Sequence, residues 1–326
     1  MKTKKIFITG VAGFIGSNLA AALLKKGYKV IGLDNLSQGE RRNIASFFKD
    51  KNFKFVKGDV RSEKTVDRLM KGVDVAVHLA AYKIPRYGNA MDTLMINTRG
   101  TRIMLEAARR NKSKFIFAST SDVYGKYPTL PFKEDGDLLL GQSRSKRWAY
   151  AVSKVFDEHL CFAYEEKYGL KVCVLRFFGS YGPNQNLTWW GGPQSVFIDA
   201  ALKNKTLEVH GDGAQTRSFT YIDDTIDGIV RAIESPKSVG EIFNIGNNKE
   251  ISILALAKLI WKLVRKDGKP KIKFVPYSKF SEKYQDVRRR IPSIEKAKKL
   301  LGFDPKTNLK EGLLKTIQWQ RKLTEC

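Results

Sequence analysis

Short apolar runs alternate with amphipathic stretches through the first half of the 326-residue chain. The runs are rich in β-branched and aromatic residues, and the stretches between them carry apolar residues at helical spacing. Strands that are apolar on both faces and joined by helices predict a parallel sheet covered on both sides, which is a doubly wound α/β fold. The expected strands are 5–9, 29–33, 54–57, 75–79, 115–119 and 171–176, and the expected helices are 17–26, 64–71, 93–110 and 146–167.

The composition changes after Arg176. Segment 177–194 is rich in Gly, Pro, Asn and aromatic residues, which predicts a long binding loop or lid. Asp223 or Asp224 is expected to cap a helix that ends at Glu234. The other expected elements are a helix at 195–203, a strand pair at 207–210 and 217–221, strands at 241–245 and 271–275, and helices at 253–266, 294–301 and 309–322.

This pattern divides the chain into two parts. Residues 1–178 are expected to form the sheet domain, which also receives about 223–246. Residues 179–222 and 247–326 are expected to form a smaller, discontinuous C-terminal lobe.

The formal net charge of +26 stands out in a composition that is otherwise ordinary, with 42% hydrophobic residues. Such a charge keeps a surface soluble, concentrates anionic ligands such as nucleoside diphosphates, or serves nucleic-acid binding. The lysines are spread along the whole chain without a nucleic-acid module, so no nucleic-acid partner is expected. No apolar run approaches the ~18 residues of a membrane helix. The three cysteines lack metal-ligand spacing, so we expect a reduced, cytoplasmic protein with no metal and no membrane partner.

A glycine motif, Gly10, Gly13 and Gly16, lies between the first expected strand and the first expected helix. Glycines there allow a tight turn, close approach of the backbone to a pyrophosphate, and close packing of a helix whose N-terminus faces the negative charge. Asp34 follows at the end of the second strand, where a carboxylate accepts hydrogen bonds from adenosine ribose hydroxyls and repels a 2′-phosphate. The motif therefore predicts a dinucleotide site that takes NAD rather than NADP.

Tyr150 and Lys154 are four residues apart, which places both side chains on one face of the helix expected at 146–167. A nearby ammonium favours the phenolate, so we expect Lys154 to lower the pKa of Tyr150. Tyr150 then becomes a candidate acid/base for a hydroxyl group.

The sequence Ser119-Thr120-Ser121-Asp122 lies at the C-terminal end of an expected strand. Such ends line the ligand crevice of open α/β sheets, where small hydroxyls can hold a substrate alcohol. We therefore expect Tyr150, Lys154 and Thr120 to be catalytic, with Ser121 and Asp122 as further candidates.

Together these motifs resemble the extended branch of the short-chain dehydrogenase/reductase superfamily, the NAD-dependent nucleotide-sugar epimerases and dehydratases. The resemblance covers essentially the whole chain and implies an N-terminal NAD-binding Rossmann domain and a C-terminal nucleotide-sugar-binding lobe. Beyond the motifs above, it rests on Asp59-Val60, His78-Leu79-Ala80-Ala81, 176–183, Gly211-Asp212-Gly213, Gln215-Thr216-Arg217 and 221–224.

The resemblance also implies individual roles. Tyr150 takes the proton from the sugar 4-hydroxyl while hydride leaves C4 for the nicotinamide, and Thr120 supports that hydroxyl. The implied cofactor-binding residues are Gly10, Gly13, Phe14, Ile15, Gly16, Asp34, Asn35, Asp59, Val60, Leu79, Ala80, Ala81, Lys83, Ser119, Tyr150 and Lys154. The implied substrate-binding residues are Arg86, Thr120, Tyr150, Gly179, Arg217, Arg288 and Arg289. Among them, Arg217 and one arginine of the run 288–290 bind the substrate diphosphate, to which a guanidinium fork is suited.

Members of the family share a first step, which gives a transient 4-keto sugar, and differ in the fate of that intermediate. A 4,6-dehydratase uses an Asp-Glu pair directly after the threonine, where this chain has Ser121-Asp122, so dehydration is disfavoured. A decarboxylase of a UDP-glucuronate-like sugar carries Thr-Ser-Glu-Val-Tyr, and Asp122 would withdraw that carboxylate by about 1.5 Å. A 4-epimerase needs only the tyrosine, lysine and threonine. We therefore expect a 4-epimerase of a UDP-hexose or UDP-uronic acid, with decarboxylation and dehydration as alternatives.

Two features of the expected pocket depart from the family. Gly179 stands where members commonly carry an asparagine that touches the substrate, so the pocket is remodelled. Trp189 and Trp190 either compensate by stacking on the uracil or covering the sugar, or pack beneath the loop. Lys83 and Arg86 would place positive charge near C6, as a uronic acid requires, unless Arg86 is a surface residue.

Two other classes of protein compete with an enzyme. One is an NAD-binding regulator, which usually lacks the Tyr/Lys pair, and the other is a nucleic-acid-binding protein that uses the net charge. The presence of both Tyr150 and Lys154 favours the enzyme. The helices at 93–110 and 146–167 resemble the pair that forms an intersubunit four-helix bundle in the family, which implies a homodimer.

Overall fold

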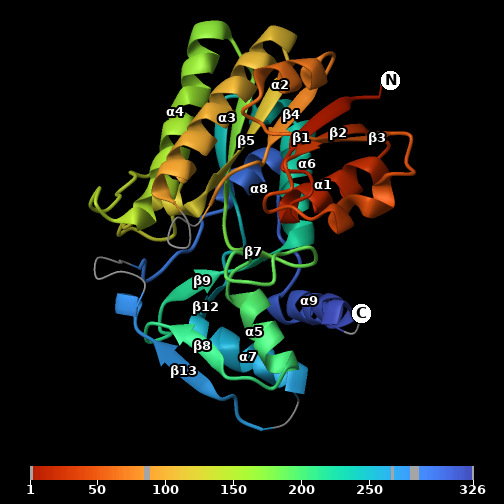
Figure 1. The fold of residues 1–326 in the computed structure, drawn as a ribbon. Coiled ribbons are helices and arrows are strands. Elements are labelled where there is room, and N and C mark those ends of the chain that lie inside the picture. Colours follow the sequence, from red (N-terminus) through yellow and green to blue (C-terminus); the bar gives the residue numbers. More distant parts are fainter. Residues whose placement is uncertain (1–2, 84–88, 266–267, 280–285, 325–326) are drawn as a thin grey trace.

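A seven-stranded parallel sheet forms the centre of the protein, with the strand order β11-β6-β5-β4-β1-β2-β3 (Figure 1). The computed structural model describes residues 3–83, 89–265, 268–279 and 286–324. The strands of the sheet are β1 (Lys5–Thr9), β2 (Lys29–Asp34), β3 (Phe53–Lys57), β4 (Val75–His78), β5 (Lys114–Thr120), β6 (Val172–Phe177) and β11 (Glu241–Ile245). The strands predicted for the first half of the chain are confirmed, and the doubly wound fold with them.

Helices cover both faces of this sheet (Figure 1). On one face α1 (Phe14–Lys25) packs against α6 (Ile222–Glu234), and on the other α2 (Glu63–Met70) and α4 (Ala149–Tyr168) flank α3 (Ala90–Asn111). Successive side chains of each strand point to opposite faces of the sheet, so a separate core forms on each face. In β1, Ile6 and Ile8 join the core under α1 and α6, whereas Phe7 joins the core under α2, α3 and α4.

The smaller lobe is built from short strand pairs between helices. β8 (Leu207–His210) pairs with β13 (Ile272–Val275), β9 (Thr216–Ser218) with β12 (Glu250–Ser252), and β7 (Ser180–Tyr181) with β10 (Thr220–Tyr221). The helices of this lobe are α5 (Pro193–Leu202), α7 (Ile253–Arg265) and α9 (Leu309–Thr324).

Three details differ from the sequence-based expectations. The predicted pairing of 207–210 with 217–221 is wrong, because Gly211 and Gly213, both at positive φ, turn the chain away and leave β8 to pair with β13. Neither Asp223 nor Asp224 caps α6. They lie in its first turn, and Asp224 accepts hydrogen bonds from the backbone of Lys306 and Thr307.

The third difference concerns α8 (Glu295–Leu301), which lies within the segment expected to form the lobe. It packs instead against α6 and β11 of the sheet domain, because Ala297 and Leu301 bury their side chains in the core around α6. Among the described residues, no helix is long and apolar enough to cross a membrane.

Candidate active site

Two adjoining clefts open beyond the carboxyl ends of the central strands. The first, here named the glycine-loop cleft, is lined by the loop between β1 and α1 and by the ends of β2, β4 and β5. The second, the arginine cleft, encloses about 410 Å³ and lies between the sheet domain and the smaller lobe. Lys83, Ser119 and Tyr150 line both clefts, so a ligand in one meets a ligand in the other beside Tyr150.

The glycine loop is a turn that tolerates no side chain at two positions. Gly10 has a φ of +73°, and a β-carbon on Gly16 would overlap the Gly10 carbonyl oxygen and lie 2.8 Å from Val11 Cα. The first helix begins directly behind the loop at Phe14. Backbone N–H groups at such a helix start are donors for a phosphate, so the loop fits the pyrophosphate of a dinucleotide.

Asp34 closes the far end of this cleft. It is buried, and its carboxylate accepts hydrogen bonds from the backbone N–H groups of Ala12 at 2.9 Å and Leu36 at 2.8 Å. Burial raises its pKa, and the backbone hydrogen bonds oppose that rise. A carboxylate can accept about four hydrogen bonds, so Asp34 can still accept one from a ribose hydroxyl. The position therefore fits an adenosine ribose without a 2′-phosphate.

Asp59 and Val60 lie beside Asp34 in the same wall. Arg61 holds the Asp59 carboxylate at 2.8 and 2.9 Å, and this ion pair lowers the pKa of Asp59 to about 2. The structure places every residue expected to bind the cofactor in the lining of the glycine-loop cleft.

Tyr150 and Lys154 lie on α4, where this helix passes the end of β5. Lys154 is buried, and its Nζ donates a hydrogen bond to the Ala118 carbonyl at 2.8 Å and lies 6.0 Å from the centre of the Tyr150 ring. Burial raises the pKa of Tyr150, Asp122 and Asp157 raise it further, and a hydrogen bond with Thr120 lowers it. The expectation that Lys154 brings the pKa of Tyr150 below its usual value is therefore wrong for this structure, because burial dominates.

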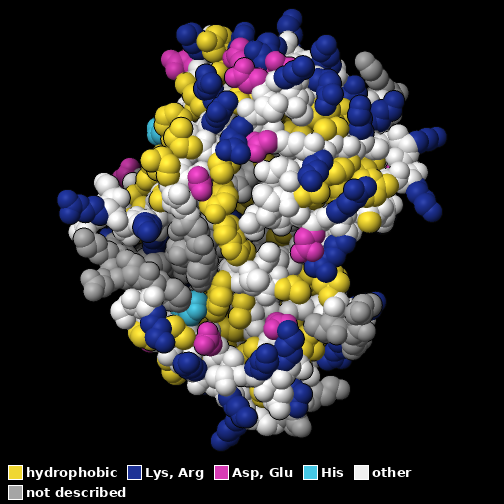
Figure 2. Space-filling model, viewed as in Figure 1, with side chains coloured by type: hydrophobic (Ala, Val, Ile, Leu, Met, Phe, Trp, Pro, Cys, Tyr) yellow, Lys and Arg dark blue, Asp and Glu magenta, His cyan; other side chains and the backbone are white. Residues whose placement is uncertain are grey.

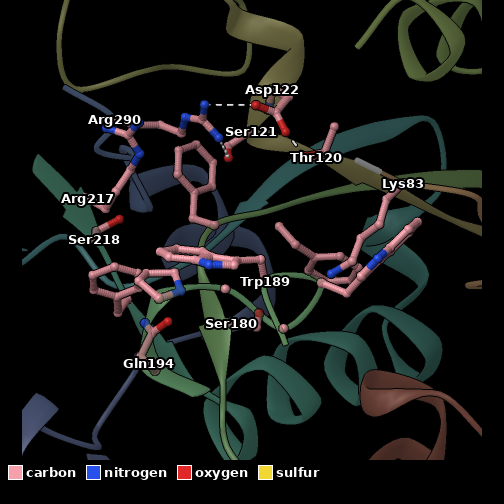
Figure 3. Close-up of a pocket in the computed structure, with 18 of the residues that line it drawn as sticks. Lys83, Thr120, Ser121, Asp122, Ser180, Trp189, Gln194, Arg217, Ser218 and Arg290 are labelled. Carbon is pink, nitrogen blue, oxygen red and sulfur yellow. Dashed lines mark hydrogen bonds and ion pairs between the residues drawn. The ribbon is translucent and has the colours of Figure 1, made fainter. Parts of the chain in front are cut away.

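The arginine cleft is lined by three arginines and two aspartates. Figure 3 labels Arg217, Arg290 and Asp122 among them. Arg290 contacts Asp122 at 2.8 Å, and Arg217 contacts Asp286 at 3.0 Å. Arg147 lies between the two carboxylates, 3.6 Å from Asp122 and 3.8 Å from Asp286. The cluster therefore carries one more positive than negative charge, which suits an anionic ligand.

These contacts fix the charge states of the cluster. The arginines hold the pKa of Asp122 down at about 2 against the opposing effect of its burial, and they lower the pKa of Asp286. Burial lowers the pKa of Arg217 to about 10, so it stays charged at neutral pH. Arg290 also donates a hydrogen bond to the Ser121 hydroxyl at 3.3 Å, which ties the smaller lobe to the end of β5 (Figure 3).

The structure divides the residues expected to bind the substrate into those that line the arginine cleft and those that do not. Arg217, Thr120, Tyr150 and Gly179 line the arginine cleft. Arg288 and Arg289 do not, because they are exposed and pair with Asp212 and Glu250, and it is Arg290 of that run that faces the cleft. Arg86 lies outside the described residues.

The backbone conformation at position 179 explains why a glycine stands there. It has a φ of +48°, and a β-carbon there would overlap the Ser218 carbonyl oxygen. A side chain at position 179 would therefore meet the strand that carries Ser218. Trp189 stacks on His210 with ring centres 3.9 Å apart, and Trp190 meets Tyr82 edge to face at 5.6 Å. Both tryptophans line the arginine cleft, so their rings are available to a ligand.

Sequence reasoning missed two charged residues of this cleft. Arg147 precedes Tyr150 by three residues, a helical spacing that could have revealed it. Asp286 reaches Arg217 across 69 residues, and no local pattern indicates that contact. Within the described parts of the chain, no group of three His, Cys, Asp or Glu side chains could hold a metal ion.

The fold is that of a dinucleotide-binding enzyme, and the arginine cleft beside the glycine-loop cleft suits an anionic ligand. Residues 7–316 match the family model described as GDP-mannose 4,6 dehydratase, and the chain belongs to this extended short-chain dehydrogenase/reductase family of nucleotide-sugar epimerases and dehydratases. The chain is 38% identical to a UDP-N-acetyl-alpha-D-glucosaminuronate decarboxylase of Bacillus cytotoxicus, over 98% of each chain. It is also 38% identical to UDP-glucuronic acid decarboxylase 1 of Xenopus tropicalis, over 99% of this chain and 73% of the relative.

Among solved structures, a UDP-glucuronic acid 4-epimerase from Bacillus cereus in complex with UDP-glucuronic acid and NAD superimposes with a TM-score of 0.88. It is 33% identical, and the match covers 98% of this chain and 99% of that one.

Proposed function

We propose that the protein is an NAD-dependent decarboxylase of a UDP-linked uronic acid. The observation that carries the proposal is Asp122, which Arg290 and Arg147 hold as an ionised carboxylate in the arginine cleft, beside Thr120 and Tyr150. The similarity to two UDP-uronate decarboxylases over nearly the whole chain supports it.

NAD fits the glycine-loop cleft, and several relatives of known structure hold it. The glycine loop would hold its pyrophosphate, Asp34 its adenosine ribose, and Lys154 its nicotinamide ribose. The chemistry that NAD would supply there is reversible hydride transfer with C4 of the sugar.

Side chains of the protein transfer the proton of the sugar 4-hydroxyl. Tyr150 receives the proton of the sugar 4-hydroxyl, and Thr120, which already hydrogen-bonds to Tyr150, orients that hydroxyl. Because burial and nearby carboxylates raise the pKa of Tyr150, positive charge close to the ring is needed for this step, and Lys154 is placed to supply part of it.

The 4-keto sugar that results would then lose carbon dioxide. A 4-keto uronic acid is a β-keto acid, so the C5–C6 bond breaks readily and its electrons move into the enolate of the ketone. Arg147 and Arg290 are placed to bind the C6 carboxylate of the substrate. The ionised carboxylate of Asp122 would lie beside the C6 carboxylate and repel it. Dehydration is disfavoured, because a group with a pKa of about 2 cannot donate a proton to a leaving hydroxyl at neutral pH.

Epimerisation at C4, which the sequence alone favoured, is the second candidate. It needs only Tyr150, Thr120 and Lys154, and the similar UDP-glucuronic acid 4-epimerase supports it. Both candidates accept a uronic acid, so they differ only in the fate of the keto acid.

The test is incubation of the NAD-loaded protein with UDP-glucuronate, UDP-N-acetylglucosaminuronate and UDP-glucose, with products identified by mass and NMR. Loss of carbon dioxide from either uronate is the expected result. A product of unchanged mass with inverted C4 would establish the epimerase instead. Turnover of UDP-glucose alone, or of none of the three, would overturn the assignment of a uronic acid.

We also propose a homodimer formed through α3 and α4. These helices expose the large apolar side chains of Met91, Met95, Val152 and Phe156, and apolar side chains gather over both helices in Figure 2. Phe156→Lys is expected to convert a dimer into a monomer in analytical ultracentrifugation. The same change at Leu314, an exposed apolar residue of α9, is the control. A monomeric wild-type protein would contradict the proposal.

The buried free thiols of Cys161 and Cys173 support a reducing, cytoplasmic location.

A further inference from the structure

A carboxylate lies buried behind the catalytic pair. Asp157 follows Lys154 by three residues and Tyr150 by seven, so the three side chains lie along one face of α4. Asp157 is fully buried, and its Oδ2 accepts a hydrogen bond from the Thr101 hydroxyl of α3 at 2.8 Å. Its Oδ1 is buried without a hydrogen-bond partner among the described residues. A carboxylate in such a place is costly unless a cation compensates its charge.

Lys154 is the cation available. Its ammonium is also buried, and Asp157 is the charge that most strongly favours the protonated form of Lys154. The neighbouring carboxylate, Glu158, is already compensated by Arg176, which contacts it at 2.7 and 3.0 Å. Within the described structure, Asp157 has no arginine of this kind. The two buried charges, Asp157 and Lys154, therefore depend on each other.

We propose that Asp157 is a positioning residue of the catalytic pair, whose carboxylate is the buried counter-ion of Lys154 and sets the pH range in which Tyr150 works. The proposal rests on the roles proposed above for Tyr150 and Lys154.

The electrostatics of the site predict the direction in which Asp157 shifts the pKa values of Lys154 and Tyr150. Burial raises the pKa of Asp157 to about 6, and Lys154 and the Thr101 hydroxyl oppose that rise. Above that pH the ionised carboxylate favours the Lys154 ammonium and disfavours the Tyr150 phenolate. Among the described residues, Glu158 and Cys161 of the same helix also act on Asp157, and α3 contributes the Thr101 hydroxyl. His78 of β4 faces Lys154, and burial together with the charge of Lys154 lowers the pKa of this histidine. Removing the charge of Asp157 should therefore lower the pKa of both catalytic groups together.

The first test needs no substrate. In protein labelled with ¹³C at the aspartate carboxyl carbons, one resonance should titrate near pH 6 and disappear in Asp157→Asn. In Lys154→Met the same resonance should titrate higher, by roughly one pH unit, because its counter-ion is gone. An unchanged pKa in Lys154→Met would overturn the proposal. Since this readout involves no turnover, it remains decisive even if the proposed reaction is wrong.

The second test is the pH dependence of turnover. Turnover needs an ionised Tyr150 and a protonated Lys154, so its pH profile has two limbs. Because removal of the Asp157 charge lowers both pKa values, both limbs should move to lower pH in Asp157→Asn, by roughly half to one unit. The matched control is Glu166→Gln, the same chemical change at an exposed position of the same helix. Asp157→Glu keeps the charge and should leave both limbs in place. A uniform loss of activity without movement of the limbs, or an equal movement in Glu166→Gln, would make Asp157 a packing residue only.

Discussion

The two clefts share Tyr150 but hold their polar groups in different ways. In the glycine-loop cleft the buried charged groups bind the backbone: Asp34 binds N–H groups of the glycine loop and of the segment after β2, and Lys154 binds the carbonyl of Ala118. In the arginine cleft charged side chains bind one another, as in the contact between Arg290 and Asp122. The first arrangement is fixed by the fold, whereas the second can change partners.

Under the proposed function, this difference predicts which cleft would distinguish one substrate from another. A backbone-bound cleft is ready before its ligand arrives, so little reorganisation opposes binding. In the arginine cleft an anionic substrate competes with Asp122 and Asp286 for the three guanidinium groups. Under the proposed function, the charge and geometry of the substrate would therefore decide this exchange of partners, and a neutral sugar would leave the internal ion pairs intact.

The largest effect is expected where the two clefts meet. Tyr150→Phe should lower kcat by roughly 10²-fold or more, because it removes the group that carries the proton. NAD binding, followed by calorimetry, should change little, since the aromatic ring stays. The matched control is Tyr168→Phe, near the end of the same helix, where the ring is exposed. Near-normal turnover by the Tyr150 variant would remove it from catalysis.

The next largest effect is expected in the arginine cleft. Arg290→Met should lower kcat/KM for a UDP-uronate on the order of 10- to 100-fold, because Asp122 loses its closest cation and the substrate loses a binding group. The pKa of Asp122, about 2 with Arg290 in place, should rise, so the variant should lose activity at a higher pH than the wild type as acid is added.

Arg288→Met is the control for that prediction. It makes the same change two residues earlier, where the arginine is exposed and contacts Asp212 at 2.9 Å. Its kcat/KM should stay within about threefold of the wild type, as expected for a surface ion pair. Equal losses in both variants would show that the contrast between Arg288 and Arg290 is wrong.

The sequence predicted the glycine-loop cleft well because its parts follow local rules. Buried parallel strands such as β1 and β5 are continuous apolar runs, and their carboxyl ends meet at one edge of the sheet. A residue at a strand end, such as Asp34, can therefore be assigned to the cleft before its contacts are known.

The arginine cleft depends on contacts between distant segments. Arg290 faces it because segment 288–290 lies against β9, where the backbone N–H groups of Thr216 and Ser218 bind the carbonyls of Arg288 and Arg290. Three consecutive arginines carry no local signal that distinguishes them, so the sequence alone could not select one. The sequence alone also could not predict that β8 pairs with β13. Nor could it predict that burial outweighs nearby charges in setting the pKa of Tyr150.

A smaller effect is expected from the glycine loop itself. Gly16→Ala should weaken NAD binding by roughly tenfold, because the added methyl group meets backbone atoms and the cost of overpacking is about 1–3 kcal/mol. Calorimetry with NAD measures the change. Gly136→Ala is the control, since the nearest atom to its β-carbon would be 3.3 Å away and it lies outside both clefts. Unaltered affinity in Gly16→Ala would mean that the loop can shift, and that the cleft is less rigid than its backbone contacts suggest.

The smallest effect is expected from Arg61→Ala, which removes an ion pair from the glycine-loop cleft. Arg61 and Asp59 are both partly exposed, so the pair should contribute less than about 1 kcal/mol and NAD affinity should change less than about threefold. The pKa of Asp59, lowered to about 2 by Arg61, should rise in the variant. A lowered carboxyl pKa stabilises the folded state above the unfolded value and loses that effect as the pH falls toward 2, so melting temperatures of variant and wild type should converge in acid. A tenfold loss of NAD affinity would show that a side-chain ion pair is essential here too, and the two clefts would then differ in degree rather than in kind.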